Sequence, residues 1–289
     1  MLERALDAEG RGHWLWVTAE ETRNLSLAGL GPALADAARW LHQPAEARSS
    51  LLEAAPPLPA AGRGRRSLPG RPGKILCLGR NFAAHAREMG SEPSLEDMLW
   101  FAKFAESCIP HEAELAVPTW LAGRIDPEAE LVLLLGAPLQ DATPAQAEQA
   151  IAAWALGNDF TARGVQAGDK EKAWPWVRSK NLRGFGSYGP GWLPHDQLPP
   201  FEQLRLQGLV NGEVRQEAPL ADMLYRPGRA LAELSRWMSL ETGDLIFLGT
   251  PAGVQALEDG DLCEVQLLAE DGSLPLGVLR NRVARMTTA

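Results

Sequence analysis

Apolar residues along the chain gather in short runs that predict strands more often than helices. The runs at 74–79 and 131–135 have the length of a strand and no polar face, which is typical of strands buried on both sides. Asn211-Gly212, between strand-like segments at 204–210 and 213–216, is the strongest short signal for a β-hairpin. Further strand-like runs lie in the C-terminal half at 245–248, 262–268 and 276–283.

Helical spacing of apolar residues is confined to a few segments. It predicts a short helix at 81–89 and an amphipathic helix at 229–238. Thr143-Pro144-Ala145-Gln146 has the form of a capping box with proline at the first helical position. We expect the helix that it starts to run to about Leu156, where Gly157 would end it. Because strands outnumber helices and do not alternate with them regularly, the pattern predicts a mainly β, α+β fold.

The N-terminal part of the chain has a pattern of its own. A strand-like patch at 13–17 and a helical stretch at 32–42 precede a proline-rich run and a segment rich in glycine and arginine at 62–74. We place a boundary near residue 70, which separates a small N-terminal domain with its linker (1–70) from a larger domain (71–289). The arginines are interpreted as part of a solvated, flexible linker rather than as a basic arm that contacts a partner.

Composition and charge exclude several classes of protein. The 289 residues are 45% hydrophobic with a formal net charge of −9, which argues for a folded chain and against a nucleic-acid partner. No apolar run approaches the roughly 20 residues of a membrane-spanning helix, and the acidic N-terminus does not resemble a signal peptide. We therefore expect a cytoplasmic protein with no membrane partner. Three cysteines without a CxxC pair indicate neither a disulfide framework nor a thiolate zinc site.

Three carboxylates are candidates for holding a hard divalent cation. Glu128 and Glu130 lead into the buried run at 131–135, and at positions i and i+2 of a strand they project to one face, where they repel each other unless a cation lies between them. Asp159 follows the predicted helix and would complete a set of oxygen ligands suited to Mg²⁺ or Mn²⁺. The alternatives are that both glutamates are solvated at the strand entrance and that Asp159 is a turn residue.

A histidine, a further glutamate and a lysine offer acid–base chemistry. His85 and Glu88 are three residues apart on a predicted helix, so the carboxylate can orient the imidazole as a general base; a surface ion pair is the alternative. Lys180 follows Trp174 and Trp176, and it either binds an anionic substrate in an apolar pocket or extends along the surface into solvent. The sequence has no Walker A motif, dinucleotide-binding fingerprint, nucleophile elbow or HExxH, which disfavours a nucleotide enzyme or a serine hydrolase.

Several short motifs follow one another from about Lys74 to Val283. They are Gly79-Arg80-Asn81-Phe82 with His85 and Glu88, Glu128-Ala129-Glu130-Leu131, Asn158-Asp159-Phe160-Thr161-Ala162-Arg163 with Gln166, Lys180, Val210-Asn211-Gly212-Glu213, Leu240-Glu241-Thr242-Gly243-Asp244, and Gly249-Thr250-Pro251-Ala252-Gly253-Val254. Each motif is a weak signal alone. In this order and spacing they resemble the fumarylacetoacetate hydrolase family.

The resemblance implies a mixed β-sheet roll with a small N-terminal domain, an open metal site and a homodimer. Family members bind a divalent metal, here expected to be Mg²⁺ or Mn²⁺, through the residues that match Glu128, Glu130 and Asp159. The pair matching His85 and Glu88 is associated with activating water in hydrolytic members. The positions that match residues of the family's substrate pocket are Arg80, Arg163, Gln166, Lys180 and Thr250.

The implied function is that of a divalent-metal-dependent hydrolase. Such an enzyme cleaves a carbon–carbon bond in a β-diketo acid of the acylpyruvate or fumarylpyruvate type, through a metal-stabilised enolate. His85 would take a proton from water while Glu88 holds the ring, and Lys180 and Arg163 would pair with substrate oxygens. Decarboxylation of a 2-oxo diacid and isomerisation of a 2-hydroxydienoate are alternatives at the same site. A non-catalytic relative that binds a metal and a carboxylate ligand, or a scaffold without metal, is the alternative of another class.

The chain departs from the family's common pattern in four places. Gly164 stands where aspartate is common, Phe82 replaces a tyrosine, and Asn181-Leu182-Arg183-Gly184 follows the lysine in place of the usual Ser-Phe-Asp-Thr. The lid region after Gly90, at 91–107, is unusual in content. None of these changes removes a candidate metal ligand, but Arg183 and the lid are expected where substrate identity is decided. We therefore expect a retained metal site and a substrate that differs from those of well-known members.

Overall fold

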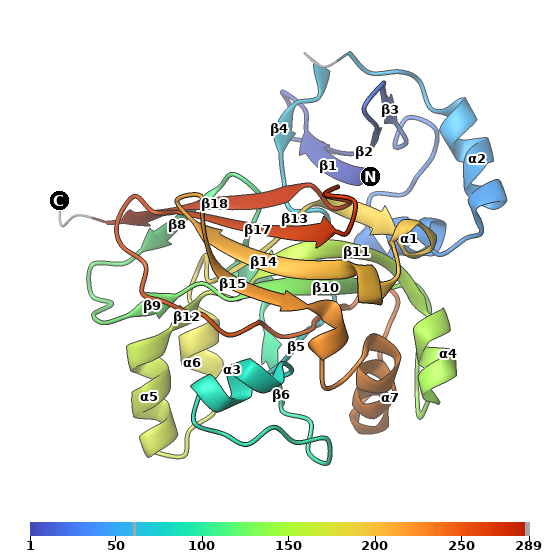
Figure 1. Cartoon of the computed structure of the whole chain (residues 1–289). Coiled ribbons are helices and arrows are strands. Elements are labelled where there is room, and N and C mark those ends of the chain that lie inside the picture. The colour runs from blue at the N-terminus through green and yellow to red at the C-terminus, as the bar shows by residue number, and fades with distance from the viewer. Residues whose placement is uncertain (60–61, 287–289) are drawn as a thin grey trace.

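The computed structural model describes residues 1–59 and 62–286, which form two packed β-sheets with short helices around them (Figure 1). In order of hydrogen-bonded neighbours, the main path of the larger sheet is β3 (Thr22–Asn24), β2 (Gly12–Val17), β1 (Leu2–Leu6), β13 (Gly186–Pro194), β11 (Ile151–Asn158), β10 (Ala129–Leu135), β16 (Leu245–Phe247), β5 (Ile75–Leu78) and β6 (Trp100–Lys103). Two short strands extend it, β4 (Arg65–Arg66) on β1 and β7 (Cys108–Ile109) on β13.

The smaller sheet packs face to face on the larger one. Its order is β15 (Glu213–Pro219), β14 (Leu204–Val210), β17 (Leu262–Ala269), β18 (Val278–Arg285) and β8 (Glu114–Val117). A separate pair joins β9 (Ile125–Asp126) to β12 (Thr161–Ala162). With 24% helix and 34% strand, the structure confirms the predicted mainly β, α+β class.

The helices are short, and the first of them packs on a face of the larger sheet. They are α1 (Leu34–Leu41), α2 (Ala45–Ala54), α3 (Ala83–Glu88), α4 (Pro144–Gln149), α5 (Arg163–Glu171), α6 (Val177–Lys180) and α7 (Pro227–Trp237), with 3₁₀ turns η2 (Ala105–Ser107), η3 (His195–Gln197), η4 (Phe201–Gln203) and η5 (Leu220–Asp222). Figure 1 shows α3, α5 and α6 gathered at one end, below the sheets in this view. Among the helices of residues 1–59 and 62–286, none has the length and apolar content needed to cross a bilayer.

Strand β10 is buried on both faces because different parts of the chain pack on either side of it. Leu131 and Leu133 belong to a hydrophobic cluster with leucines of β14 and β17. Val132 and Leu134 belong to a second cluster, which contains Trp14 of β2 and residues of α1. The absence of a polar face in this run, noted from the sequence, is therefore explained by burial on both sides.

The predicted helix from Thr143 to about Leu156 is wrong in its second half. The capping box is present, since the Gln146 N–H donates to Thr143 Oγ1, but α4 ends at Gln149 and the chain continues as β11 from Ile151. Every residue of β11 is buried, because the strand pairs with β10 on one side and β13 on the other. An apolar stretch without a polar face fits that position better than it fits a surface helix. Asp159 consequently follows a central strand rather than a helix.

The N-terminal segment joins the larger sheet through β1, in which Leu2 pairs with Trp192 of β13. The interpretation of 62–74 as a flexible linker is wrong for Arg65–Arg66, which pair with Ala5 and Leu6 as β4. The division near residue 70 stays a prediction. The predicted hairpin is present, with both of its turn residues, Asn211 and Gly212, at positive φ.

Candidate active site

Glu128, Glu130 and Asp159 come together where β10 and β11 lie side by side. Ala129 of β10 pairs with Asn158 of β11. The glutamates on either side of Ala129 therefore lie near Asp159, which follows Asn158. One carboxylate oxygen from each of the three residues lies within 4.8 Å of the others. All three side chains are buried, so the alternative of solvated carboxylates at a strand entrance is wrong. Sequence spacing alone did not place Asp159 beside the glutamates.

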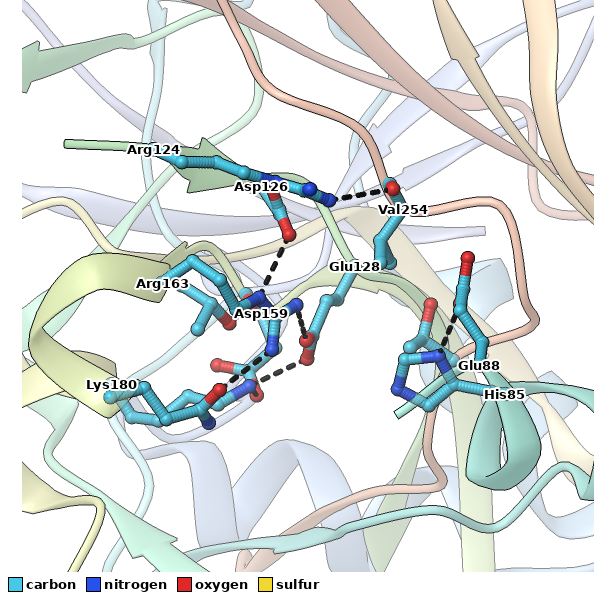
Figure 2. Close-up of polar contacts among 12 residues, drawn as sticks. His85, Glu88, Arg124, Asp126, Glu128, Asp159, Arg163, Lys180 and Val254 are labelled. Carbon is cyan, nitrogen blue, oxygen red and sulfur yellow. Dashed lines mark hydrogen bonds and ion pairs between the residues drawn. The ribbon is translucent and has the colours of Figure 1, made fainter. Parts of the chain in front are cut away.

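Cationic side chains hold two of these carboxylates. Lys180 Nζ lies 2.5 Å from Glu128 Oε2 and 2.6 Å from Asp159 Oδ2 (Figure 2). Arg163 Nη2 donates to Glu128 Oε1 at 2.6 Å, and Lys103 Nζ lies 2.7 Å from Asp159 Oδ1. Burial by itself would raise the pKa of Glu128, but Lys180 and Arg163 outweigh it and lower the pKa to about 2.

Lys180 is itself buried in this cluster, 2% exposed, so it is not a surface lysine that extends into solvent. Burial acts to lower the pKa of Lys180, yet the adjacent carboxylates Asp159 and Glu128 more than compensate and hold that pKa above its usual range. The ammonium group is therefore charged, and it lies at the floor of the site.

Glu130 differs from its two neighbours because it is held by the main chain. Its Oε2 accepts a hydrogen bond from the Gly249 N–H at 2.6 Å, and within the described residues no lysine or arginine forms an ion pair with it. Burial, followed by the charges of Asp159 and Glu128, raises the pKa of Glu130 well above its ordinary value. A cation bound by all three carboxylates would relieve this repulsion. The donor set and its burial thus fit a hard divalent ion such as Mg²⁺ or Mn²⁺.

The predicted pair on α3 is formed. His85 Nδ1 lies 3.0 Å from Glu88 Oε2, and Glu88 Oε1 accepts a hydrogen bond from the Gly253 N–H at 3.0 Å. An ionised Glu88 keeps the proton on Nδ1, which leaves Nε2 free to accept another. Figure 2 shows Nε2 on the side of the ring that faces the carboxylates. His85 is 4% exposed, so this is not the surface ion pair of the alternative interpretation.

Both groups lie at one cavity of about 260 Å³. Of the predicted site residues, those that line it are Arg80, His85, Glu128, Glu130, Arg163, Gln166, Lys180 and Thr250. Asp159 lies beneath the lining in contact with Lys180, and Glu88 lies behind His85. The apolar part of the wall consists of Leu78, Met89, Phe101, Ala167 and Trp176. The structure therefore brings all the predicted residues to one place.

Neighbouring side chains fix the polar groups that face the cavity. Gln166 Oε1 accepts a hydrogen bond from Arg163 Nη1 at 2.7 Å, and Thr250 Oγ1 accepts one from Gln216 Nε2 at 2.7 Å. Arg80 has a φ of 59°, in the left-handed region that residues other than glycine rarely adopt, and its guanidinium lies 5.7 Å from the ring centre of Trp176. Such strained residues cluster at functional sites, where the surrounding structure holds them.

Among the residues of the site that the sequence analysis missed are Asp126, Gln216 and Lys103. Asp126 is fully buried and accepts a hydrogen bond from Arg163 Nε at 2.8 Å, and Gln216 accepts one from the Ala129 N–H at 3.1 Å. Lys103 lies in β6, so the expectation of a lid over all of 91–107 is wrong for that part. The signals were present: Asp126 continues the alternation of Glu128 and Glu130, and Lys103 is a single lysine in an aromatic and apolar run.

Two of the departures from the family pattern lie away from the cavity. Phe82 is 1% exposed and packs in the hydrophobic cluster between the sheets. Arg183 is exposed and does not contribute to the described cavity lining, so its expected role in substrate choice is not supported. The side chains that do face the cavity from this region belong to α6 and its preceding loop, Lys180 and Trp176.

Comparison with known proteins gives consistent matches. Residues 74–284 match the family described as fumarylacetoacetate (FAA) hydrolase C-terminal. Oxaloacetate tautomerase YcgM of Escherichia coli is 34% identical over 209 residues, which cover 71% of this chain and 92% of the relative. The structure of fumarylpyruvate hydrolase from Pseudomonas aeruginosa with Mn²⁺ and pyruvate is 34% identical, with a TM-score of 0.68 over 74% of this chain and 90% of that one. A 5-carboxymethyl-2-hydroxymuconate delta-isomerase from Mycobacterium smegmatis is 27% identical, with a TM-score of 0.75 over 99% of both chains.

Proposed function

The chain belongs to the fumarylacetoacetate hydrolase family, and we propose that it is a divalent-metal-dependent hydrolase of a β-diketo acid of the acylpyruvate or fumarylpyruvate type. The observation that carries this proposal is the arrangement of two groups around one cavity. A buried set of three carboxylates lies on one side, and His85, oriented by Glu88, presents a free nitrogen from the other. The similarity to a fumarylpyruvate hydrolase supports this assignment.

Glu128, Glu130 and Asp159 are the residues that would hold Mg²⁺ or Mn²⁺. When bound, such an ion would supply a Lewis acid that stabilises negative charge developing on substrate oxygens. The similar fumarylpyruvate hydrolase, solved with Mn²⁺ and pyruvate, supports this pairing of a divalent ion with a 2-oxo acid.

The residues of this chain then act on water and on the substrate. His85 Nε2 takes a proton from a water molecule as its oxygen adds to the distal carbonyl carbon, while Glu88 stabilises the imidazolium that forms. The carbon–carbon bond breaks, its electron pair goes to the departing carbon, and the proton is returned to that carbon. Arg163 offers a planar guanidinium to substrate oxygens, and Lys180 adds positive charge from below. The products are a 2-oxo acid and a carboxylic acid.

Tautomerisation of a small 2-oxo diacid is a second candidate. It is favoured by the identity of 34% to oxaloacetate tautomerase YcgM and by the likeness of the whole chain to an isomerase structure. In this reaction His85 would move a proton between the substrate's carbon and oxygen, with no added water. The two candidates therefore share the same residues and differ in whether water reaches the carbonyl beside His85.

A panel assay on the Mn²⁺-loaded protein tests the proposal. Acetylpyruvate and fumarylpyruvate report hydrolysis through the loss of diketone absorbance, and the enol form of oxaloacetate reports tautomerisation. We expect hydrolysis by the wild type, at least about 100-fold less by His85→Ala and by Glu130→Gln, and full activity in the exposed control Glu9→Gln, whose carboxylate pairs with Arg11. Turnover of oxaloacetate enol alone would transfer the assignment to the tautomerase. Mn²⁺ binding without turnover of any substrate would refute both.

A further inference from the structure

A lysine that the proposed reaction does not use lies beneath the cavity. Lys103 ends β6, and its side chain is completely buried, whereas two of the other residues of the strand are partly buried and one is exposed. Its Nζ lies 2.7 Å from Asp159 Oδ1 and also donates a hydrogen bond to the main-chain carbonyl oxygen of Lys180. Lys103 therefore contacts a candidate metal ligand and the backbone of the candidate substrate-binding lysine.

The segment after Lys180 forms the surroundings of Lys103. Asn181 Oδ1 accepts a hydrogen bond from the Phe104 N–H at 2.5 Å, and Asn181 Nδ2 donates to the Ala102 carbonyl oxygen at 3.3 Å, so one amide holds both chain neighbours of Lys103. At Gly186, a Cβ atom would lie 2.6 Å from Cε of Lys103, so the lysine side chain fills the space that this glycine leaves. Part of this segment is where the chain departs from the family's common pattern.

We propose that Lys103 is a positioning residue that limits the metal affinity of the carboxylate cluster and fixes the backbone of Lys180, and that Asn181 and Gly186 hold it there. This inference rests on the proposed function, because it assumes that Glu128, Glu130 and Asp159 hold a divalent cation. It also gives a role to Asn181, for which the sequence alone offered none.

The sign of the effect on metal binding distinguishes this role from a purely structural one. The Lys103 ammonium touches the same carboxylate that would bind the metal, so the two cations repel each other across a buried, weakly screened site. Removing the ammonium therefore strengthens metal binding. It also releases the carbonyl of Lys180 and should slow turnover. A residue that merely supported the fold would, when removed, loosen the site and weaken metal binding.

The experiment compares Mn²⁺ binding to wild-type protein and Lys103→Met without substrate, by electron paramagnetic resonance of free Mn²⁺. We expect the Kd of Lys103→Met to fall about tenfold, about 1.4 kcal/mol, while kcat of the loaded enzyme falls at least about tenfold. The matched control is Lys74→Met, because Lys74 Nζ lies 2.8 Å from Asp244, a buried carboxylate that does not line the described cavity. That variant should lose stability without a change in Kd.

Two further variants separate the possible failures. If Asp159→Asn still binds Mn²⁺ with wild-type affinity, the proposed metal site itself is wrong. If Asp159→Asn loses Mn²⁺ but Lys103→Met binds it with equal or lower affinity, the role of Lys103 is overturned and the metal site stands. Should Lys103→Met not fold, Asn181→Ala keeps the lysine and removes the two hydrogen bonds beside it. A smaller decrease in Kd is then expected, and an unchanged Kd would overturn the inference.

Discussion

The two walls of the cavity are built in different ways. The carboxylates come from the ends of β10 and β11, central strands whose backbone is hydrogen-bonded on both sides. Ion pairs to Lys180 and Arg163 hold Glu128 and Asp159, and a backbone N–H holds Glu130. His85 comes from α3, a helix of six residues, and its orientation depends on Glu88 and on one amide of the loop after β16. A metal needs several ligands fixed at once, whereas a general base needs one nitrogen presented to the cavity. Substitutions among the carboxylates should therefore lower metal affinity, whereas substitutions of His85 or Glu88 should lower turnover and leave metal affinity unchanged.

The largest effect is expected on the carboxylate wall. Glu130→Gln keeps the size of the side chain but removes the charge of the carboxylate that no lysine or arginine of the described residues pairs with. Mn²⁺ affinity should fall by more than about 100-fold, and activity should fall with it. Titration calorimetry with Mn²⁺ measures the affinity. An unchanged affinity would mean that Glu130 is not a ligand.

A large effect of a different kind is expected on the histidine wall. His85→Ala removes the proposed base, so kcat should fall about 100- to 10,000-fold while Mn²⁺ affinity stays within about twofold of wild type. Steady-state kinetics at saturating Mn²⁺, together with the same calorimetry, measure both quantities. The matched control is His42→Ala, since His42 bonds to the Gln149 carbonyl away from the cavity. Equal losses of affinity and kcat in His85→Ala would contradict the separation of the walls.

A smaller effect is expected when the support of His85 is weakened. Glu88→Gln keeps one acceptor oxygen, for either His85 or the Gly253 N–H, and it no longer offers a negative charge to the imidazolium. Since charge-assisted hydrogen bonds are roughly twice as strong as neutral ones, kcat should fall about tenfold. Steady-state kinetics at saturating Mn²⁺ measure kcat of this variant. A kcat equal to that of the wild type would show that Glu88 is only structural.

The smallest effect is on stability as a function of pH in the metal-free protein. The pKa of Glu130 in the folded protein is raised above its value of about 4.3 in the unfolded chain. The free energy of unfolding therefore decreases as pH rises from about 4.3 through the folded-state pKa, because the buried carboxyl must ionise. For Glu128, with a folded pKa of about 2, the sign is opposite: its stabilisation is present above about pH 4.3 and is lost as pH falls towards 2. Between pH 5 and 8, Tm of Glu130→Gln should exceed that of wild type by a few degrees, increasingly at higher pH. Parallel Tm curves would contradict this assignment.

Much of this arrangement was available from local sequence. The spacing of Glu128 and Glu130 predicted two carboxylates on one strand face, and the spacing of His85 and Glu88 predicted a pair on one helix face; both are present. The cap at Thr143 was also visible, because the groups that form it lie within four residues. Such features depend on neighbours along the chain, and a sequence records those neighbours directly.

Strand pairing and long-range charge contacts decided the features that only the tertiary structure shows. The run from Ile151 to Leu156 became a strand because β10 and β13 lie on either side of it, and this pairing put Asp159 beside the glutamates. Because β6 lies next to α6, Lys103 reaches the Lys180 carbonyl, and it also contacts Asp159 across more than fifty residues of chain. The sequence by itself determined the family, the strand-rich class and the chemistry of the residues. Which buried charges share a site depends on long-range packing, and neither the spacing nor the type of residue encodes it locally.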